Sequence, residues 1–207
     1  PKETLKRTIL PLGNLTKKEV RKIASDNNFE NANTPESMEI CFVPDNNYKR
    51  FVREYAKDKV NHLDKPGSIL NEKGDKIGEN EGYINYTIGQ RKGIGLSNPN
   101  PLYVKEIDSK NNSITVTEKK SLFSKECYIS NINWLNNNFK LPLNLLAQIR
   151  YNGNISKVSV MKDKDKILAN FNEPQLAITP GQSIVFYNED EVLQGGGIIE
   201  ITWLKNL

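Results

Sequence analysis

Cysteine is scarce in this sequence, and one of the two cysteines lies where a reactive thiol could stand. Cys41 belongs to the stretch ESMEICFV, an apolar run that follows two glutamates and precedes a proline. A cysteine among apolar neighbours is often simply a core side chain. A reactive cysteine needs positive charge or amide dipoles that favour its thiolate, whereas Glu36 and Glu39 bring negative charge. If Cys41 is reactive, its activating group must come from elsewhere in the fold.

The second cysteine and the single histidine of the sequence argue against a metal site. Cys127 lies far from Cys41 in the sequence, no C-x-x-C pair occurs, and His62 is the one histidine. These groups cannot form a tetrahedral zinc site of the usual Cys/His kind, so we expect no metal. No signal peptide is evident, and no apolar run approaches the roughly 18 residues that a membrane span needs. We therefore expect a cytoplasmic protein with free thiols and no membrane partner.

A second candidate site is the basic, glycine-rich stretch TIGQRKGIGL at residues 87–96. It places Gln90, Arg91 and Lys92 among three glycines, which allow a backbone to approach a ligand closely. The stretch is not a dinucleotide-binding fingerprint, because Asn98 stands where the third glycine would fall and no helix is expected after it. Two interpretations remain open here: a plain turn, or a loop that contacts phosphate or RNA.

Two further segments carry side chains that suit RNA. Arg150 can pair with a phosphate and Tyr151 can stack on a base. We expect both on a strand, where neighbouring side chains point to opposite faces, so one of the two would be structural. Gln182 ends the turn sequence TPGQ. The glycine run at 195–197 needs no ligand, because a bulge or close strand packing also explains it.

The elements that must position these residues divide into a helical part and a strand-rich part. Thr16 and Glu19 form a capping box that predicts a helix ending near Asn27. Asp45 is the expected N-cap of a second helix, whose apolar stripe includes Tyr48, Phe51, Val52 and Tyr55. Helical periodicity disappears after about residue 63, where we place a boundary.

Short alternating runs fill the rest of the chain. A hairpin is expected from residues 103–107 and 114–117 around a turn rich in Asp, Asn and Ser. Near-regular spacing of the later runs predicts a closed barrel or a sandwich. Strands are expected at residues 84–88, 145–151, 157–161, 167–171, 183–187 and 197–203.

Composition agrees with a globular protein of one to three compact units. The 207 residues are 37% hydrophobic and 26% charged, and the formal net charge is +4. That charge is compatible with a polyanionic partner if the cations cluster, but a solvated lysine-rich surface is the simpler explanation.

Taken together, the motifs resemble one known family. The order LPLGNLTKKEVRKIA, ESMEICFVPD, PGSI, IGENEGYINYTIGQRKGIGL, IRY, TPGQSIVFY and GGGIIE is similar to the C-terminal part of the tRNA-specific 2-thiouridylases, the MnmA/TrmU family. The resemblance runs almost from end to end. It implies an α+β fold that is mostly β, with a helical segment at 1–63 that ends the catalytic domain, a small β-rich central domain at 64–118, and a C-terminal antiparallel β-barrel at 119–207.

The resemblance also implies an activity. Members are ATP-dependent sulfurtransferases that convert the anticodon wobble uridine of tRNA to 2-thiouridine. Cys41 matches the cysteine that carries a persulfide, delivered by a cysteine desulfurase or a sulfur-relay protein. The family's SGGVDS nucleotide-binding loop and its first catalytic cysteine do not occur in these 207 residues. We therefore expect ATP to be bound by an N-terminal domain that this chain lacks, and the chain alone to be inactive.

The resemblance implies tRNA contacts for Arg150, Tyr151 and Gln182, and it favours RNA contact or interdomain contact for the loop of Gln90, Arg91 and Lys92. Two other functions stay open. A stand-alone RNA-binding β-barrel without chemistry predicts an inert Cys41, and a protein-interaction adaptor predicts neither RNA binding nor sulfur transfer.

Overall fold

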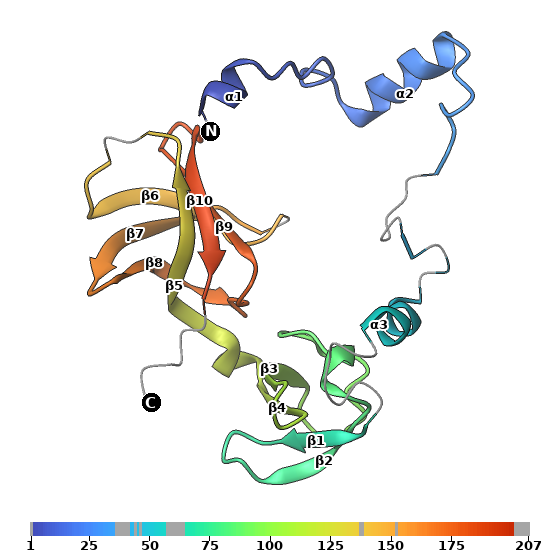
Figure 1. The fold of residues 1–207 in the computed structure, drawn as a ribbon, viewed down its shortest axis with the longest axis vertical. Coiled ribbons are helices and arrows are strands. Elements are labelled where there is room, and N and C mark those ends of the chain that lie inside the picture. The colour runs from blue at the N-terminus through green and yellow to red at the C-terminus, as the bar shows by residue number, and fades with distance from the viewer. Residues whose placement is uncertain are drawn as a thin grey trace. The chain divides into compact units, whose positions relative to one another are not determined.

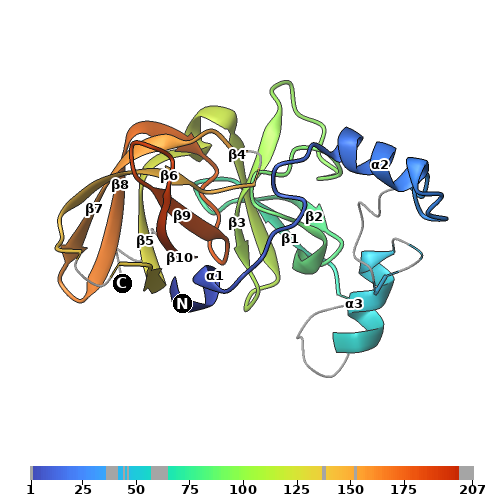
Figure 2. The ribbon, with the colours of Figure 1, turned by 90° about the horizontal axis from the view of Figure 1, so that it is seen from above.

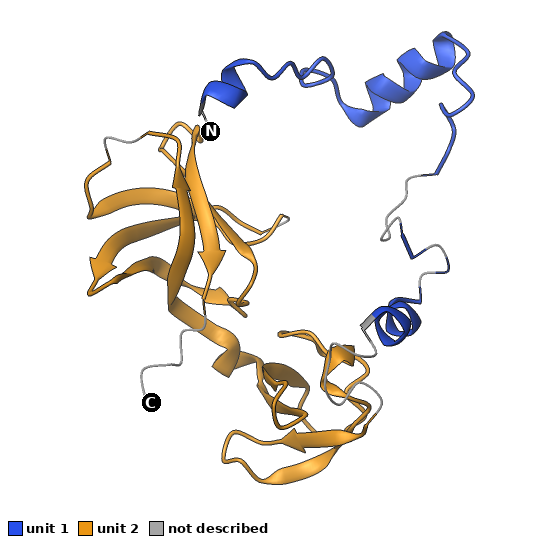
Figure 3. Cartoon of the chain, in the orientation of Figure 1, with its two compact units in different colours: residues 1–55 blue, residues 56–207 orange. Residues whose placement is uncertain are grey.

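The computed structural model describes residues 2–35, 42–43, 45, 47–56, 65–136, 139–151 and 153–200. The chain forms two compact units, residues 1–55 and residues 56–207 (Figure 3). The first holds helices and the second holds two separate sheets, which confirms the expected mostly-β fold class. The expected boundary near residue 63 falls outside the described residues, and the three-domain division stays a prediction.

The helices described in this part of the chain are α1 (Lys2–Lys6), α2 (Lys17–Asp26) and α3 (Tyr48–Ala56), the last of which ends at the boundary with the second unit. The predicted capping box of α2 is present. The Thr16 hydroxyl accepts from the Glu19 amide at 3.3 Å, and the Glu19 carboxylate accepts from the Thr16 amide at 2.6 Å. These bonds satisfy amides that a helix start leaves unpaired. The hydrogen bonds that the Thr16 amide and hydroxyl donate to the Glu19 carboxylate lower the pKa of Glu19.

Helix α3 is capped two residues later than the sequence suggested. The Asn47 side chain, and not that of Asp45, accepts from the Arg50 amide at 2.9 Å, so the predicted cap was wrong. Asp45 instead accepts from the Arg50 guanidinium at 2.8 Å and from the Asn47 amide at 3.2 Å. The guanidinium bond is the main cause that lowers the pKa of Asp45 to about 2.

The second unit begins with a four-stranded sheet. Its order is β2-β1-β4-β3, with β1 parallel to β4 and the other pairs antiparallel. The predicted hairpin is confirmed as the β3/β4 pair. The strands are β1 (Gly67–Leu70), β2 (Lys76–Asn80), β3 (Leu102–Asp108) and β4 (Ser113–Glu118). The core behind them is formed by Ile69, Tyr86, Ile94, Val104, Ile114 and Val116.

The strand expected at residues 84–88 is absent, and a 3-10 helix, η1 (Tyr83–Asn85), takes its place. The amides of the expected strand bond to the preceding turn: the Asn85 amide donates to the Gly82 carbonyl at 3.1 Å, and the Tyr86 amide donates to the Tyr83 carbonyl at 3.2 Å. Side chains hold that turn in place. The Gly82 amide donates to Asn80 at 2.7 Å, and the Tyr83 amide donates to Asn112 at 3.1 Å. Asparagine side chains compete with ladder hydrogen bonds in this way, and Asn112 lies too far along the chain for a local pattern to reveal it.

The second sheet of this unit is a closed antiparallel barrel of order β10-β5-β8-β7-β6-β9 (Figure 1; Figure 2). Closure resolves the choice between barrel and sandwich. A short 3-10 helix, η2 (Lys119–Leu122), leads into it from β4. Its strands are β5 (Phe123–Trp134), β6 (Leu143–Gln148), β7 (Ser156–Asp163), β8 (Lys166–Leu176), β9 (Ser183–Tyr187) and β10 (Leu193–Ile199). The predicted strands are confirmed with shifted ends, and residues 201–203 lie outside the described residues.

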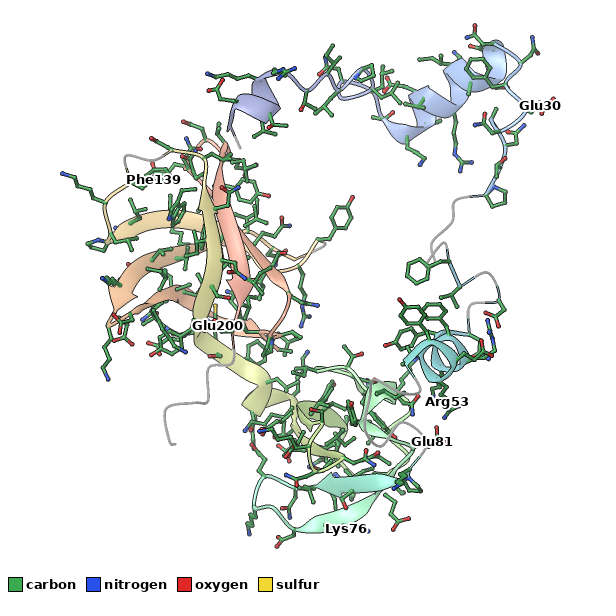
Figure 4. All side chains as sticks on the ribbon, viewed as in Figure 1. Glu30, Arg53, Lys76, Glu81, Phe139 and Glu200 are labelled. Carbon is green, nitrogen blue, oxygen red and sulfur yellow. The ribbon has the colours of Figure 1, made fainter. Side chains whose placement is uncertain are left out.

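Side chains from all six strands and their connections fill the barrel (Figure 4). Phe171 and Phe186 are the largest fully buried side chains, and Trp134 stacks on Phe186 with ring centroids 5.3 Å apart. Phe139, labelled in Figure 4, meets the Trp134 ring edge-on at 5.3 Å. Aromatic contacts of this kind add to the free energy gained from burial.

The glycine run of β10 is explained by close strand packing, one of the two structural explanations considered. A Cβ atom on Gly196 would lie 2.7 Å from the Ile184 carbonyl oxygen, and one on Gly197 would lie 2.8 Å from the Ser130 carbonyl oxygen. The register of β10 against β5 also shifts between Gly196 and Ile198. The glycines therefore let β10 fit between its two neighbours.

We expect Gly196→Ala to destabilise the barrel, because the new methyl group meets backbone that cannot rotate away. Overpacking of this kind costs about 1–3 kcal/mol of unfolding free energy. Urea denaturation followed by tryptophan fluorescence measures the change. Ser183→Ala, at an exposed position of the adjacent strand, is the control and should change stability by less than about 0.5 kcal/mol. Equal stability of the two variants would contradict the packing role.

Candidate functional site

Three of the segments singled out in the sequence meet at one residue, Ala177, directly after β8. Its carbonyl oxygen accepts from the Arg150 guanidinium at 2.6 Å and from the Thr179 hydroxyl at 2.9 Å. A Cβ atom on Gly89, next to the Gln90 loop, would lie 3.2 Å from the Ala177 methyl carbon. Ala177 thus joins the glycine-rich loop, the Arg150 turn and the TPGQ turn, which the sequence separates by up to 95 positions.

Ala177 is held tightly in an unfavourable backbone conformation. Its φ is 48°, in the left-handed region, and 4% of its surface is exposed. Its amide donates to the Leu122 carbonyl at 2.8 Å, so the residue also ties the end of β8 to η2. Left-handed backbone costs a non-glycine residue on the order of 1 kcal/mol and persists only where surrounding contacts over-determine it. Nothing in the local sequence signals this position.

The glycine-rich loop is anchored by backbone and by one side chain. The Gly89 amide donates to the Val104 carbonyl at 2.7 Å, and the Val104 amide donates back to the Gln90 carbonyl at 2.9 Å. The Gln90 side chain accepts from the Thr87 amide at 3.0 Å and donates to the Lys92 carbonyl at 2.9 Å. Gln90 therefore shapes the loop with both ends of its side-chain amide, while Arg91 and Lys92 are exposed.

Arg150 and Tyr151 lie in a turn, because β6 ends at Gln148. The expectation that they share a strand and face opposite ways was wrong. The Gln148 side-chain amide closes the turn by donating to the Tyr151 carbonyl at 3.1 Å and the Gly153 carbonyl at 2.8 Å. Tyr151 is 95% exposed, whereas one guanidinium nitrogen of Arg150 is bound to Ala177. Arg150 is therefore bound to the protein and Tyr151 is not, but the reason is the geometry of the turn and not the two faces of a strand.

The TPGQ turn is part of the barrel wall. The Gly181 amide donates to the Ile199 carbonyl at 2.9 Å, and the Ile199 amide donates back to the Gln182 carbonyl at 2.8 Å. Gly181 has a φ of 83°, which favours glycine at this position. The backbone of Gln182 is therefore fixed while its side chain is exposed.

A cavity of about 270 Å³ adjoins Ala177 and is lined by Ile88, Lys105, Ala177, Ile178 and residues 121–124. At its rim, Lys105 donates to the Glu72 carboxylate at 2.6 Å, and this bond is the main cause that lowers the pKa of Glu72. The Ser121 hydroxyl lies 3.5 Å from the same carboxylate. Glu72 therefore links the β1–β2 turn to β3 and to η2.

The two cysteines differ in what the structure describes. Cys41 lies outside the described residues, and its role stays a prediction. Cys127 lies on β5 in the barrel core with no exposed surface, and burial raises the pKa of its thiol to about 12. A thiol with that pKa is protonated at neutral pH and has little nucleophilic character.

Two further findings concern metals and membranes. Within residues 65–136 and the other described ranges, no three His, Cys, Asp or Glu side chains lie together as ligands for a metal ion. No helix in the described part of the chain has the length and hydropathy required to cross a membrane.

Family models match the chain in three consecutive pieces. Residues 1–45 match a model described as the tRNA methyl transferase HUP domain, and residues 49–118 match the tRNA methyl transferase PRC-barrel domain. Residues 124–199, which span nearly all of the barrel, match the aminomethyltransferase beta-barrel domain.

The chain is also similar to curated proteins that are named tRNA-specific 2-thiouridylase MnmA. The chain is 44% identical over 200 residues to the tRNA-specific 2-thiouridylase MnmA of Carboxydothermus hydrogenoformans, covering 96% of this chain and 53% of that protein. It is 44% identical to MnmA 1 of Caldanaerobacter subterraneus subsp. tengcongensis (96% and 54% covered) and 40% identical to MnmA of Natranaerobius thermophilus (98% and 55%). The chain spans about half the length of these relatives. It belongs to the tRNA-specific 2-thiouridylase family.

Proposed function

We propose that this chain is the sulfur-carrying and tRNA-contacting part of an ATP-dependent tRNA sulfurtransferase that makes 2-thiouridine at the anticodon wobble position. The observation that carries the proposal is the convergence of three candidate RNA-binding segments on Ala177. Fixing their backbones through one residue gives a preorganised surface from parts distant in sequence, which lowers the entropy cost of binding.

The exposed side chains around this surface have the chemistry that RNA requires. Arg91 and Lys92 supply positive charge for phosphates, and the 95% exposed ring of Tyr151 offers a stacking surface for an unpaired base. The Gln182 amide can donate to and accept from a base edge or a ribose hydroxyl. Arg150 acts chiefly as a positioning residue through Ala177, with its remaining N–H groups available to a phosphate.

The described residues do not fit ATP. A phosphate-binding glycine loop opens a helix, but the loop at 87–96 pairs with β3 through Gly89 and Gln90. We therefore assign ATP to a part of the HUP domain other than residues 1–45. Its chemical contribution would be to turn the uridine O2, a poor leaving group, into a good one.

In this proposal Cys41 holds the sulfur as a persulfide received from a cysteine desulfurase or a relay protein. The outer sulfur either attacks C2 of the activated uridine directly or leaves as sulfide when a second cysteine forms a disulfide with Cys41. In both routes the oxygen departs with its activating group. The direct route leaves a C2–S–S–Cys41 link, and the second cysteine then attacks the Cys41 sulfur and releases the thiolated base. The disulfide formed between the two cysteines therefore supplies the two electrons that reduce the transferred sulfur in both routes.

The RNA surface is tested by the salt dependence of tRNA binding. Lys92→Ala should lower the slope of log K against log salt by about 0.7–0.9 without changing the melting temperature. Arg150→Ala should weaken binding and also lower the unfolding free energy by about 1–2 kcal/mol, because Ala177 loses a charge-assisted hydrogen bond. Filter binding at several salt concentrations and thermal denaturation provide the two readouts.

Lys162→Ala is the matched control for these variants. Lys162 is an exposed cation near the end of β7 that leads into the β7–β8 turn, whereas the Arg150 turn precedes the start of β7. Its loss should leave the salt slope unchanged. Binding that ignores salt in the unmodified chain would make these cations structural, and the absence of tRNA binding would favour the adaptor function.

The sulfur site is tested by incubating the chain with a cysteine desulfurase and cysteine, followed by mass spectrometry of alkylated peptides. We expect one added sulfur on Cys41 and none on Cys127, whose buried thiol has a pKa of about 12. Cys41→Ser should abolish the modification and preserve tRNA binding. An unmodified Cys41 would support the RNA-binding barrel without chemistry, and sulfur on Cys127 would refute the assignment.

We also expect residues 1–207 alone to produce no 2-thiouridine from tRNA, ATP and a persulfide donor. The sequence contains no SGGVDS loop, and the family's first catalytic cysteine is absent from it. Nucleoside mass spectrometry of the tRNA measures the product, and joining the chain to a complete HUP domain of a relative should restore it. Product formed by residues 1–207 would show that the activating site lies within them.

A further inference from the structure

A second cavity of the strand-rich unit is formed by the loop that leads from Gln90 into β3. Its volume is about 380 Å³, and its walls are Arg91, residues 93–96 and residues 98–102. This volume lies within the range of about 300–1,000 Å³ that is usual for small-ligand sites. One loop thus supplies the whole cavity, which we call the loop cavity.

The loop is held by its apolar side chains. Ile94 is 5% exposed and belongs to the core of the four-stranded sheet, and Leu96 packs against the same core. Farther along the loop, the Asn98 side chain donates to the Asn100 carbonyl at 2.8 Å. The loop cavity is therefore formed before a ligand arrives, which lowers the entropy cost of binding.

Two glycines leave the backbone of the loop accessible. Gly93 and Gly95 are exposed, and their φ angles of 76° and 81° lie in the left-handed region. Neither amide donates to an acceptor in the described part of the chain. Backbone that alternates between left-handed and ordinary residues can turn neighbouring N–H groups toward one anion. The wall of the loop cavity therefore has two amide donors to offer a ligand.

Arg91 brings positive charge to the loop cavity. Within the residues that the structure describes, no carboxylate pairs with the Arg91 guanidinium. Glu118 accepts from the Asn100 side chain at 3.3 Å, but its charge is offset by Lys120 at 2.9 Å. Lys92 is exposed and does not line the cavity. The two cations of the loop therefore differ, because only Arg91 belongs to a formed site.

This set of donors suits a phosphate group. A guanidinium can bind two phosphate oxygens at once in a fixed fork, and backbone N–H groups can bind the remaining oxygens. An acidic peptide offers a similar charge. The loop cavity, however, continues from the candidate RNA surface, because Arg91 directly follows Gln90 in the sequence. A phosphate of bound RNA is therefore the ligand that the surroundings favour.

We propose that the loop cavity binds one backbone phosphate of tRNA, held by the Arg91 guanidinium and by the Gly93 and Gly95 amides. This inference rests on the proposed function and adds to it a phosphate site of defined composition. In this site Arg91 needs its planar fork, whereas Lys92 attracts RNA through its charge alone. The site positions RNA and takes no part in bond making.

The site is tested by two-dimensional proton–nitrogen NMR of residues 1–207 during titration with hexauridylate RNA. The Gly93 and Gly95 amide signals and the Arg91 Nε signal should shift, and the Gly74 amide signal should not. Inorganic phosphate should shift the same signals only at higher concentration, and hexaglutamate should leave them in place. Equal shifts with hexaglutamate would indicate an acidic-peptide site, and a response to inorganic phosphate without one to RNA would indicate a free-anion site. Either result would refute the inference.

Variants test the same site through tRNA affinity. Arg91→Lys keeps the charge but removes the fork, so it should weaken binding about 2- to 13-fold, the range for one lost hydrogen bond, with an unchanged salt slope. Gly95→Ala should also weaken binding, because a Cβ atom disfavours left-handed backbone. Filter binding at several salt concentrations measures both effects.

Gly74→Ala is the matched control for Gly95→Ala. Gly74 has a φ of 87°, and a Cβ atom on either glycine would have no other atom within 4 Å. The two variants should lower the melting temperature alike, but Gly74→Ala should bind tRNA like the unmodified chain. If Arg91→Lys and Gly95→Ala also bind normally, or if Gly74→Ala binds as weakly as Gly95→Ala, the inference is refuted while tRNA binding stands. If the unmodified chain binds no tRNA, the proposed function itself fails.

Discussion

The backbone of Ala177 is the constraint on which the candidate RNA surface depends. One carbonyl group accepts from Arg150 and Thr179, one amide binds Leu122, and one methyl group packs on Gly89. These contacts compensate for a left-handed conformation that an isolated alanine would avoid. Because the barrel and the four-stranded sheet share them, the exposed side chains on both sheets are fixed relative to each other within residues 56–207.

The structure separates residues that support the surface from residues that can contact a ligand. Side-chain N–H groups bind nearby carbonyl groups in three residues, Gln90, Gln148 and Arg150. The exposed side chains are those of Arg91, Lys92, Tyr151 and Gln182. Each supporting side chain fixes the turn from which an exposed neighbour projects. Turns that are already ordered lose less conformational entropy when a ligand binds. A small number of side chains can then provide specificity.

Local features were readable from the sequence and distant ones were not. The Thr16–Glu19 capping box and the alternating strands depend on residues a few positions apart, and both are confirmed. The expected strand at 84–88 was wrong because the Asn85 and Tyr86 amides bond to the preceding turn, which Asn112, far along the chain, holds through the Tyr83 amide. Ala177 carried no signal, since alanine does not ordinarily favour left-handed backbone. The barrel was anticipated but its closure required the non-local β5–β10 pairing.

The parallel pairing of β1 with β4 has a consequence for the order in which the sheet assembles. Ser68 pairs with Ser113 across 45 positions, whereas β3 and β4 are joined by a short turn. Loop-closure entropy favours the hairpin first. Asn112 in that turn then donates to the Lys65 carbonyl at 2.9 Å and accepts from the Tyr83 amide at 3.1 Å. During translation, β1 can pair with β2 as soon as both are made, but its other edge has no partner until the β3/β4 hairpin has followed.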